Sequence, residues 1–351
     1  MLGNPSHEPS VTVIPDSLYQ EAIERFRQAP SVALTTHVNG DADGLGSLAA
    51  LRRWLLDLGT RVDVVLPTAP GETYAFLDPE GAFLVAGRDV DPAAMDPPAL
   101  VCIVDTCTWQ QLEGVEGLVQ AAGAEVLVID HHRTRDAVAD LELVDPEAAA
   151  AVVLVHRLLT LAGADIDART ASALFVGLVG DTDGFRLPNV GPETFRLAGD
   201  LVEAGADPWA VHERLNLSDR LQKLHLWGRA AQTLHLACDG RVAVLHVTRA
   251  MLEAVDAERS DTEGLINTSL QVRGVRVGVM LRETEDGAVR VSLRSVPGVD
   301  VLQVAERFGG GGHTRAAGAR TAGPLQEAEA RVLEAVGAAV GGTPLPAPEK
   351  A

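Results

Sequence analysis

The sequence predicts an α/β protein with an N-terminal, mostly parallel sheet flanked by helices and a smaller C-terminal α/β domain with a mixed sheet. Two observations support this fold class. Short apolar runs alternate with helical patterns in the first part of the chain, which is typical of βαβ units. After about residue 218, paired apolar runs around tight turns indicate hairpins instead. The chain has 351 residues, 46% of them hydrophobic, which is enough for two domains with substantial cores.

The N-terminal elements follow in regular order. A first helix is expected over residues 17–29, where Pro30 ends it. A second helix over 45–58 starts directly after Asp43-Gly44 and has apolar residues at helical spacing. The expected strands are 31–36, 61–66, 82–85, 100–104 and 125–129. Further helical segments are expected near 147–161, 170–179 and 192–204.

The C-terminal elements follow a different pattern. Residues 234–238 and 241–246 flank Asp239-Gly240, which favours a tight hairpin turn. Residues 275–281 and 289–294 form a second predicted hairpin. Helices are expected near 250–255, 260–271, 299–307 and 324–338. The resulting domain plan is a flexible N-terminus (1–16), a catalytic domain (17–207), a helical linker (208–233), a substrate-binding domain (234–340) and a disordered tail (341–351).

Composition excludes several classes of protein. With 29 Lys and Arg against 49 Asp and Glu, the net charge of -20 repels a long nucleic-acid backbone, so no stable binding of long DNA or RNA is expected. Cys102, Cys107 and Cys238 show no pairing pattern, which fits a reducing cytoplasm. The first sixteen residues contain no basic segment followed by an apolar one, and no apolar stretch has the length of a membrane span, so we expect a cytoplasmic protein without a membrane partner.

Four acidic clusters give the main functional signal. They are His37-Val-Asn-Gly-Asp41-Ala-Asp43-Gly44, Val104-Asp105-Thr106, Asp130-His131-His132 and Gly180-Asp181-Thr182-Asp183. Each follows an apolar run that is typical of a strand, although the fourth run, 173–179, also lies within a helical pattern. A single Asp there is commonly a turn former or a helix cap. Four in series, two of them with His, instead predict a shared ligand site at the carboxyl ends of strands.

The residue types in these clusters suit two divalent metal ions. Asp41 and Asp43 can face different ions, Asp105 can bridge them, and His37 and His131 complete a mixed nitrogen and oxygen set. Without a thiolate in any cluster, this set favours Mn²⁺, with Mg²⁺ or Co²⁺ as alternatives, over a structural zinc site. Such a pair activates a shared hydroxide and stabilises both oxygens of a phosphoryl displacement. His132, beside a ligand, is suited to act as a general acid or to bind the phosphoryl group.

A run of four glycines, Gly309 to Gly312, is the second signal. Such a run lets backbone amides approach a phosphate closely, although a flexible linker or a helix C-terminal stop is the alternative. Arg186, after the fourth acidic cluster, is a further candidate, with an unrelated surface arginine as its alternative. The substrate-binding residues expected in the C-terminal domain are Arg294, Ser295, Gly310, Gly311, Gly312, His313 and Arg315.

Together these residues resemble the DHH phosphoesterase superfamily. The four acidic clusters resemble its four motifs, and Gly309 to His313 with Arg294-Ser295 resembles its DHH-associated C-terminal domain. The likeness spans roughly residues 17–335. It implies one metal ion on His37, Asp41 and Asp105 and a second on Asp43, Asp105, His131 and Asp181. It also implies a catalytic set of His132, Asp105 and Asp130, with His132 at the phosphate and the glycine run at the nucleotide.

Within the superfamily, the length and the glycine loop are most similar to the nanoRNase and pAp phosphatase branch. The resemblance implies hydrolysis of oligonucleotides of about two to five nucleotides to mononucleotides, which suits an acidic surface, and removal of the 3′-phosphate from 3′-phosphoadenosine 5′-phosphate (pAp). A cyclic or linear dinucleotide phosphodiesterase, a RecJ-like single-strand exonuclease and a non-catalytic nucleotide sensor are the alternatives. Both a homodimer and a monomer are compatible with the sequence.

Overall fold

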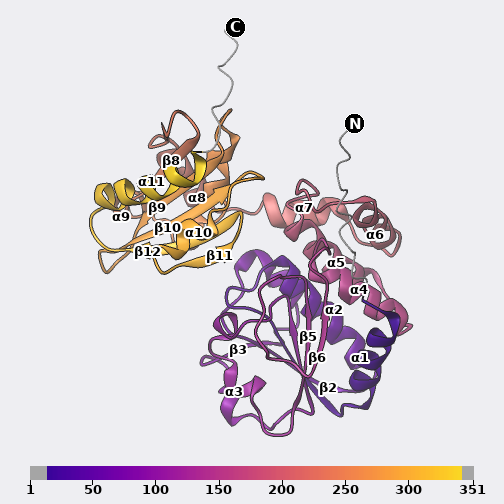
Figure 1. Cartoon of the computed structure of the whole chain (residues 1–351). Helices are drawn as coiled ribbons and strands as arrows, with labels where there is room; N and C mark the ends of the chain where they lie inside the picture. The colour runs from indigo at the N-terminus through magenta and orange to yellow at the C-terminus, as the bar shows by residue number, and fades with distance from the viewer. Residues whose placement is uncertain (1–13, 342–351) are drawn as a thin grey trace, which may run out of the picture. The chain divides into compact units, whose positions relative to one another are not determined.

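The computed structural model describes residues 14–341, and the chain divides into two compact units between Ser218 and Asp219 (Figure 1). The first unit carries the four acidic clusters and the second carries the glycine run. Most of the predicted flexible N-terminus (1–16) and disordered tail (341–351) lies outside the described residues. The predicted α/β class with two sheets is confirmed.

The first unit is built on a sheet of six parallel strands. Its strand order is β3-β2-β1-β4-β5-β6, so the chain proceeds outward from β1 on one side and from β4 on the other. The sequence does not predict β6, because this strand follows β5 through a loop without the crossover helix that usually joins parallel strands. The strands are β1 (Ser31–Thr35), β2 (Arg61–Leu66), β3 (Phe83–Val85), β4 (Leu100–Val104), β5 (Glu125–Asp130) and β6 (Leu141–Val144).

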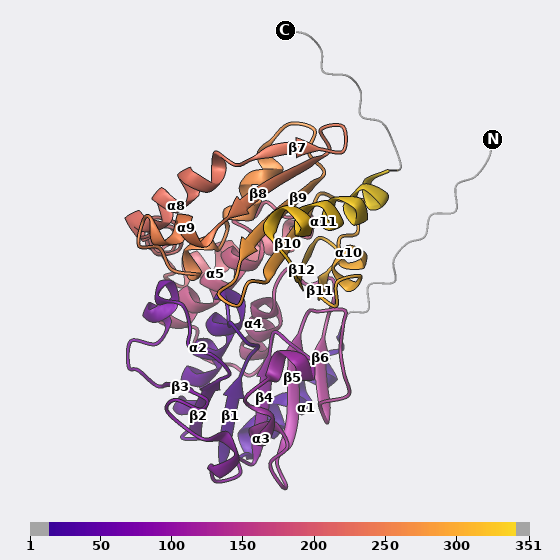
Figure 2. The ribbon, with the colours of Figure 1, turned by 90° about the vertical axis from the view of Figure 1, so that its left-hand side faces the viewer.

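Alternate residues of these strands face two hydrophobic clusters, one on each side of the sheet. Figure 2 shows helices beside the strands of this sheet. Val32 and Leu34 pack against the long helices on one face, while Ala33 packs on the other face with α3 (Glu116–Val119). The helices of the first face are α1 (Asp16–Gln28), α2 (Ala42–Asp57), α4 (Ala151–Leu161) and α5 (Ala168–Asp181). The short 3-10 segments are η1 (Glu72–Leu77), η2 (Pro92–Ala94) and η3 (Trp109–Leu112), and α6 (Pro192–Glu203) and α7 (Pro208–Asn216) end the unit.

The run before the fourth acidic cluster is not a strand. Residues 173–179 lie inside the helix α5, and Asp181 is the last residue of that helix. Leu174, Phe175, Val176 and Leu178 are all buried, because α5 packs on several sides at once. A helix that is apolar nearly all round has no polar face to reveal its period, so a short stretch of it resembles a buried strand.

The second unit holds a mixed sheet of six strands in the order β11-β12-β10-β9-β8-β7. Both predicted hairpins are present, as β7 with β8 and β9 with β10, while β8 and β9 pair in parallel. The predicted helix over 260–271 is two 3-10 segments, η4 (Ser260–Thr262) and η5 (Leu265–Gln271), because Gly264 adopts a left-handed backbone between them. The strands are β7 (His235–Ala237), β8 (Val242–Val247), β9 (Val277–Glu283), β10 (Val289–Ser295), β11 (Gly311–His313) and β12 (Ala316–Thr321).

Helices cover both faces of this sheet. One face packs on α10 (Leu302–Glu306) and α11 (Leu325–Val340), and the other on α8 (Leu221–Ala231), η5 and α9 (Arg249–Glu253). The segment predicted as one helical linker, 208–233, is divided between the units: α7 belongs to the first and α8 to the second. The extended backbone of Arg220 separates the two helices.

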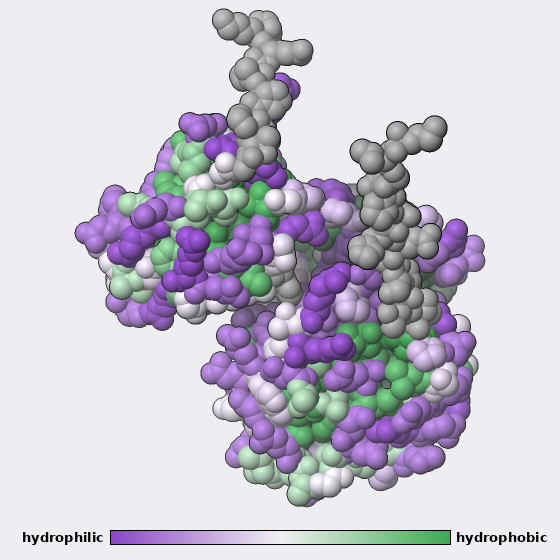
Figure 3. Space-filling view, in the orientation of Figure 1, coloured by the Kyte–Doolittle hydropathy of each residue, from purple (hydrophilic) through white to green (hydrophobic). Residues whose placement is uncertain are grey.

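Hydrophilic side chains cover most of the surface that faces the viewer in Figure 3. Within residues 14–341, every helix is too short or too polar to cross a lipid bilayer.

Candidate active site

The site lies where the strand order of the first sheet reverses. β1 and β4 are neighbours, but the chain leaves them toward opposite edges of the sheet. Loops that diverge in this way open a crevice at the carboxyl ends of the two strands, which is where open α/β sheets bind ligands. His37 follows β1 and Asp105 follows β4, so the fold places both side chains at this crevice.

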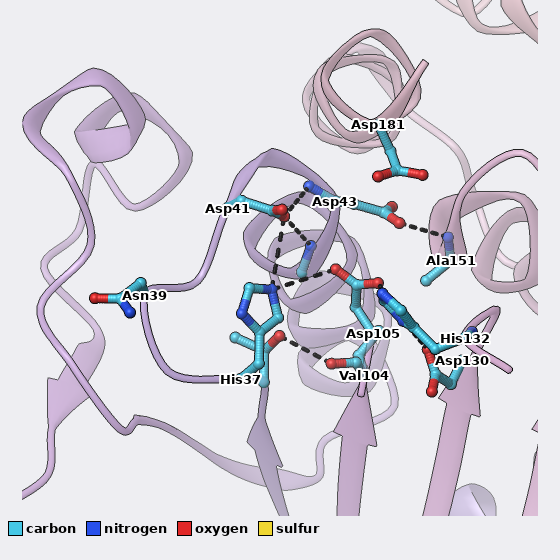
Figure 4. Close-up of polar contacts among 12 residues, drawn as sticks. His37, Asn39, Asp41, Asp43, Val104, Asp105, Asp130, His132, Ala151 and Asp181 are labelled. Atoms are coloured by element: carbon cyan, nitrogen blue, oxygen red, sulfur yellow. Dashed lines mark hydrogen bonds and ion pairs between the residues drawn. The ribbon is translucent and has the colours of Figure 1, made fainter. Parts of the chain in front are cut away.

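Asp105 stands at the centre of the site (Figure 4). Its Oδ2 lies 3.4 Å from His37 Nε2, and its Oδ1 lies 3.4 Å from His131 Nε2. Asp105 has a φ of 64°, a left-handed backbone that is costly for a residue with a Cβ, and its N–H still donates to Ile129 O at 2.9 Å. This backbone turns the carboxylate between the two histidines rather than along the strand.

His37 and Asp41 form one side of the site. Asp41 is the N-cap of α2, where its Oδ1 accepts from the N–H groups of Asp43 and Gly44 and lies 3.8 Å from His37 Nε2. His37 Nδ1 is 2.9 Å from Val38 O. In the neutral ring, a proton on Nδ1 donates to this carbonyl and leaves the Nε2 lone pair facing the carboxylates, as a metal ligand requires.

Asp43, His131 and Asp181 form the other side. His131 Nε2 lies 3.8 Å from Asp43 Oδ2 and 3.5 Å from Asp181 Oδ2. Asp43 lies in α2, and its buried carboxylate packs against the start of α4. Its two oxygens accept from the N–H groups of Ala151 and Val152 at 2.5 and 2.9 Å. Those amides carry the positive end of the α4 dipole, so they hold the carboxylate in place with one orientation.

Close helix packing brings Asp181 to this position, although it comes from a helix rather than a strand. A Cβ on Gly46 would lie 2.4 Å from Ala173 O, and a Cβ on Gly180 would lie 2.3 Å from Ala42 Cβ. A Cβ on Gly177 would meet Val152 at 2.5 Å. Glycine at these positions therefore lets α5 approach both α2 and α4 closely. The sequence alone does not predict the packing role of these three glycines, because a glycine within a helical pattern does not reveal which neighbour it contacts.

His132 is held by Asp130 beside this cluster. Asp130 is fully buried, and its Oδ1 accepts from the backbone N–H groups of His131 and His132 and from the His132 ring at 2.7 Å. His132 Nδ1 lies 3.6 Å from Asp105 Oδ1. Asp130 therefore orients the histidine pair, while His132 itself borders the carboxylate cluster.

The electrostatics of the site call for added positive charge. Burial, with the charges of Asp105 and Asp41, raises the pKa of Asp181 to about 6, and burial with Asp105 raises the pKa of Asp43. Burial disfavours protonated His37 and His131, but Asp105 and other carboxylates outweigh it and raise the pKa values of these rings to about 11 and about 10. Four carboxylates so close together, with Asp43 and Asp105 buried, are stable only with protons or cations among them.

Metal ions fit this arrangement of donors. Donor atoms of His37, Asp41 and Asp105, and those of Asp43, His131 and Asp181, lie within 4.8 Å of one another in each set. Asp105 Oδ1 and His131 Nε2 are buried and have no hydrogen-bond partner among the described residues. Orphaned polar atoms of this kind cost free energy unless a ligand satisfies them. The mixed oxygen and nitrogen donors can therefore hold divalent cations.

The predicted substrate residues of the second unit are only partly available to a ligand. Gly309 and Gly310 donate their amides to Glu306 and Ala305 at the end of α10, so half of the glycine run is the helix stop that was the alternative reading. Gly310 and Gly312 also approach β12 too closely for a Cβ, whereas Gly311 faces open space.

The remaining candidate residues differ in the partners that they already have within the protein. The Ser295 hydroxyl donates to Val299 O, and Arg294 Nη1 donates to Leu293 O while burial lowers the pKa of its guanidinium. Arg315 directly precedes β12. The backbone of His313, in β11, pairs with Ala316, in β12, while the side chain of His313 lies outside what the structure describes. Arg186, in the first unit, is bound to Asp183 by its guanidinium at 2.8 Å, so it has a partner within the protein.

Known proteins share this arrangement of domains. The family model described as the DHH family, N-terminal domain, matches residues 31–178, and the model of the DHHA1 domain matches residues 239–342. The bifunctional oligoribonuclease and PAP phosphatase NrnA of Thermus thermophilus is 33% identical over 314 residues, 87% of this chain and 89% of that protein. The protein of the same name from Bacillus subtilis is 27% identical over 304 residues, 85% of this chain and 92% of that protein.

A solved structure agrees in fold. An exopolyphosphatase-related protein from Bacteroides fragilis matches with a TM-score of 0.88 and 23% identity, over 93% of this chain and 98% of that one. The resemblance drawn from the motifs is thus confirmed by independent matches over both domains. The chain belongs to the DHH phosphoesterase family and is a hydrolase of the phosphodiesterase and phosphatase type.

Proposed function

We propose that this protein is a manganese-dependent phosphoesterase that hydrolyses short oligonucleotides to nucleoside 5′-monophosphates and removes the 3′-phosphate of pAp. The central observation is that Asp105 faces His37 on one side and His131 on the other, each at 3.4 Å. One carboxylate between two donor sets is the arrangement that a pair of metal ions requires. The names of the two NrnA relatives support the substrate class.

We assign the donors to two ions as the family resemblance implies. His37, Asp41 and Asp105 would hold one ion, and Asp43, Asp105, His131 and Asp181 the other. When bound, such ions make water more acidic and offset the charge that develops on a transferring phosphoryl group. Oxygen and imidazole donors suit Mn²⁺, with Mg²⁺ and Co²⁺ as alternatives.

His132 supplies the proton chemistry in this proposal. Burial disfavours its protonated ring, but Asp130 and Asp105 outweigh burial and raise its pKa, so the imidazolium is more populated near neutral pH than for an ordinary histidine. Asp130 fixes the ring through Nδ1. The ring can then donate a proton or a hydrogen bond to the leaving or phosphoryl oxygen. Asp130 is a positioning residue in this scheme.

A substrate panel tests the proposal. We expect kcat/KM with Mn²⁺ to be highest for pAp and for oligoribonucleotides of about two to five nucleotides, because the net charge of -20 offers a long polyanion little attraction. Linear diadenylate, cyclic di-AMP and a single strand of about twenty nucleotides complete the panel. Processive degradation of the long strand at the dinucleotide's efficiency would favour an exonuclease instead, and preference for cyclic di-AMP would favour a cyclic-dinucleotide phosphodiesterase. Tight binding without turnover would indicate a sensor.

A further inference from the structure

Three arginines lie side by side on the sheet of the second unit. Arg282 of β9 is paired in register with Arg290 of β10, and Arg290 is paired with Arg320 of β12. Cross-strand partners project from the same face of a sheet, and like charges placed directly opposite destabilise it. An arrangement that lowers stability and has no compensating interaction within the protein indicates that a ligand binds there.

Arg282 is the most constrained of these residues. It is only 6% exposed, and no hydrogen bond or ion pair holds its guanidinium among the described residues. Burial lowers the pKa of Arg282, and the charges of Arg259 and Arg290 lower it further. Arg259 and Arg290 likewise form no ion pair within residues 14–341. Leaving a buried guanidinium unpaired among like charges is strongly unfavourable unless an anion joins it.

These guanidinium groups line an open hollow of about 870 Å³ between α9, the β9–β10 hairpin and β12. Carboxylates line it as well, but several of them have other partners. Asp286 pairs with Arg320, Glu258 pairs with Arg220, and Glu253 lies 3.7 Å from Arg249. The lining holds five arginines and six carboxylates, but among the described residues none of the six lies within ion-pair distance of Arg259, Arg282 or Arg290, so these three guanidinium groups have no direct carboxylate partner.

The hollow is on the same sheet face as Arg294. Along β10, Val289, Val291 and Leu293 pack toward α10 and α11, so Arg290 and Arg294 both project from the opposite face. Their separation of four positions corresponds to about 13 Å along a strand. A phosphate bound at Arg290 is therefore within reach of an oligonucleotide whose end lies at Arg294.

We propose that Arg259, Arg282 and Arg290 form a phosphate-binding site in the second unit, separate from Arg294 and from the metal ligands. Guanidinium groups bind phosphate oxygens by paired, charge-assisted hydrogen bonds, and two or three of them suit a dianion better than a carboxylate. The phosphate can come from the distal part of an oligonucleotide substrate or from a separate phosphorylated molecule. The first source rests on the proposed function, and the second does not.

The first experiment needs no turnover. Sulfate serves as a tetrahedral dianion, and it is titrated into the manganese-loaded, full-length protein at constant ionic strength while the thermal midpoint is measured. We expect sulfate to raise the midpoint of the wild type but not that of Arg282→Met or Arg290→Gln. Without sulfate, Arg282→Met should melt no lower than the wild type, because the variant loses an unpaired buried charge. Arg229→Gln, an exposed arginine on α8 outside the hollow, is the matched control.

The second experiment separates the two sources. If the phosphate belongs to a substrate, Arg290→Gln should lower kcat/KM for a pentanucleotide about tenfold and leave that for a dinucleotide unchanged. If it belongs to a separate molecule, the sulfate effect is lost while both substrates are turned over normally. Arg290 is exposed, so we expect the Arg290→Gln variant to fold. This variant therefore remains informative even if Arg282→Met fails to fold. The site is refuted if Arg290→Gln matches Arg229→Gln in both experiments.

Discussion

Asp105 combines two demands that few residues meet together. Its backbone is left-handed, which only Gly, Asn and Asp adopt readily, and its two oxygens face different histidines. Asp105→Asn keeps the backbone preference and removes the charge. We expect kcat to fall by about three orders of magnitude or more at saturating Mn²⁺, with little change in the melting temperature. Turnover and a circular dichroism melt check this, and a folded variant that retains more than about a tenth of the rate contradicts it.

His131 and His132 are adjacent but should fail in different ways. His131 Nε2 faces three carboxylates, whereas His132 is held outside them by Asp130. We expect excess Mn²⁺ to restore part of the activity of His131→Ala, because the lost group controls ion occupancy, and to restore none in His132→Ala. Rates measured over a range of Mn²⁺ concentrations check this. Equal rescue of the two variants would remove the distinction between ligand and proton donor.

Among the elements, the packing of α5 against α4 and α2 depends on Gly177. A Cβ there would lie 2.5 Å from Val152 Cγ1 and 3.1 Å from Asp43 Oδ1. We expect Gly177→Ala to cost about 1–3 kcal/mol of stability and to weaken Mn²⁺ binding, because α5 must move away and carries Asp181 with it. Gly199→Ala in α6, where nothing lies within 4 Å, is the control and should be neutral or slightly stabilising. Chemical denaturation and metal titration measure both effects.

The glycine run of the second unit should divide by position. Gly310→Ala places a Cβ 2.1 Å from Gly318 O, so we expect lower stability. Gly311→Val meets no atom within 4 Å, so the variant should fold. If the Gly311 amide binds the nucleotide, the valine should raise KM severalfold and leave Mn²⁺ affinity unchanged. An unchanged KM would assign the whole run to the α10 stop and the β11 strand.

Sequence reasoning was most successful where local pattern and topology agree. β1, β2, β4 and β5 are predicted almost residue by residue, because each is a short apolar run bounded by turn signals. The clustering of the proposed ligand residues was also predicted, because carboxylates and histidines that follow such strands must meet at one edge of the sheet. β6 and the glycine contacts depend on distant partners, which a local pattern does not contain. For α5, the sequence supported both a strand and a helix, and only its packing decides between them.

At the scale of the whole molecule, each unit has its own hydrophobic core and its own part of the proposed chemistry. A chain truncated after Ser218 should therefore fold and bind Mn²⁺, since all the proposed ligands lie before that residue. We expect its kcat/KM for a dinucleotide to fall by about a hundredfold or more, because the proposed substrate contacts are lost. Metal titration and turnover of the truncated chain check this. Turnover equal to the full chain would show that the second unit does not bind substrate.

Asp43 also affects how the site can form as the chain is synthesised. Its carboxylate accepts from the amide of Ala151, 108 residues further along the chain. A nascent chain of which only the first strands have left the ribosome therefore contains the Asp43 carboxylate without these partners. The start of α4 supplies those amides. Asp181 is synthesised later still, because it is the last residue of α5. Since domains fold from the N-terminus during translation, the ribosome must release most of the first unit before this half of the site can capture an ion.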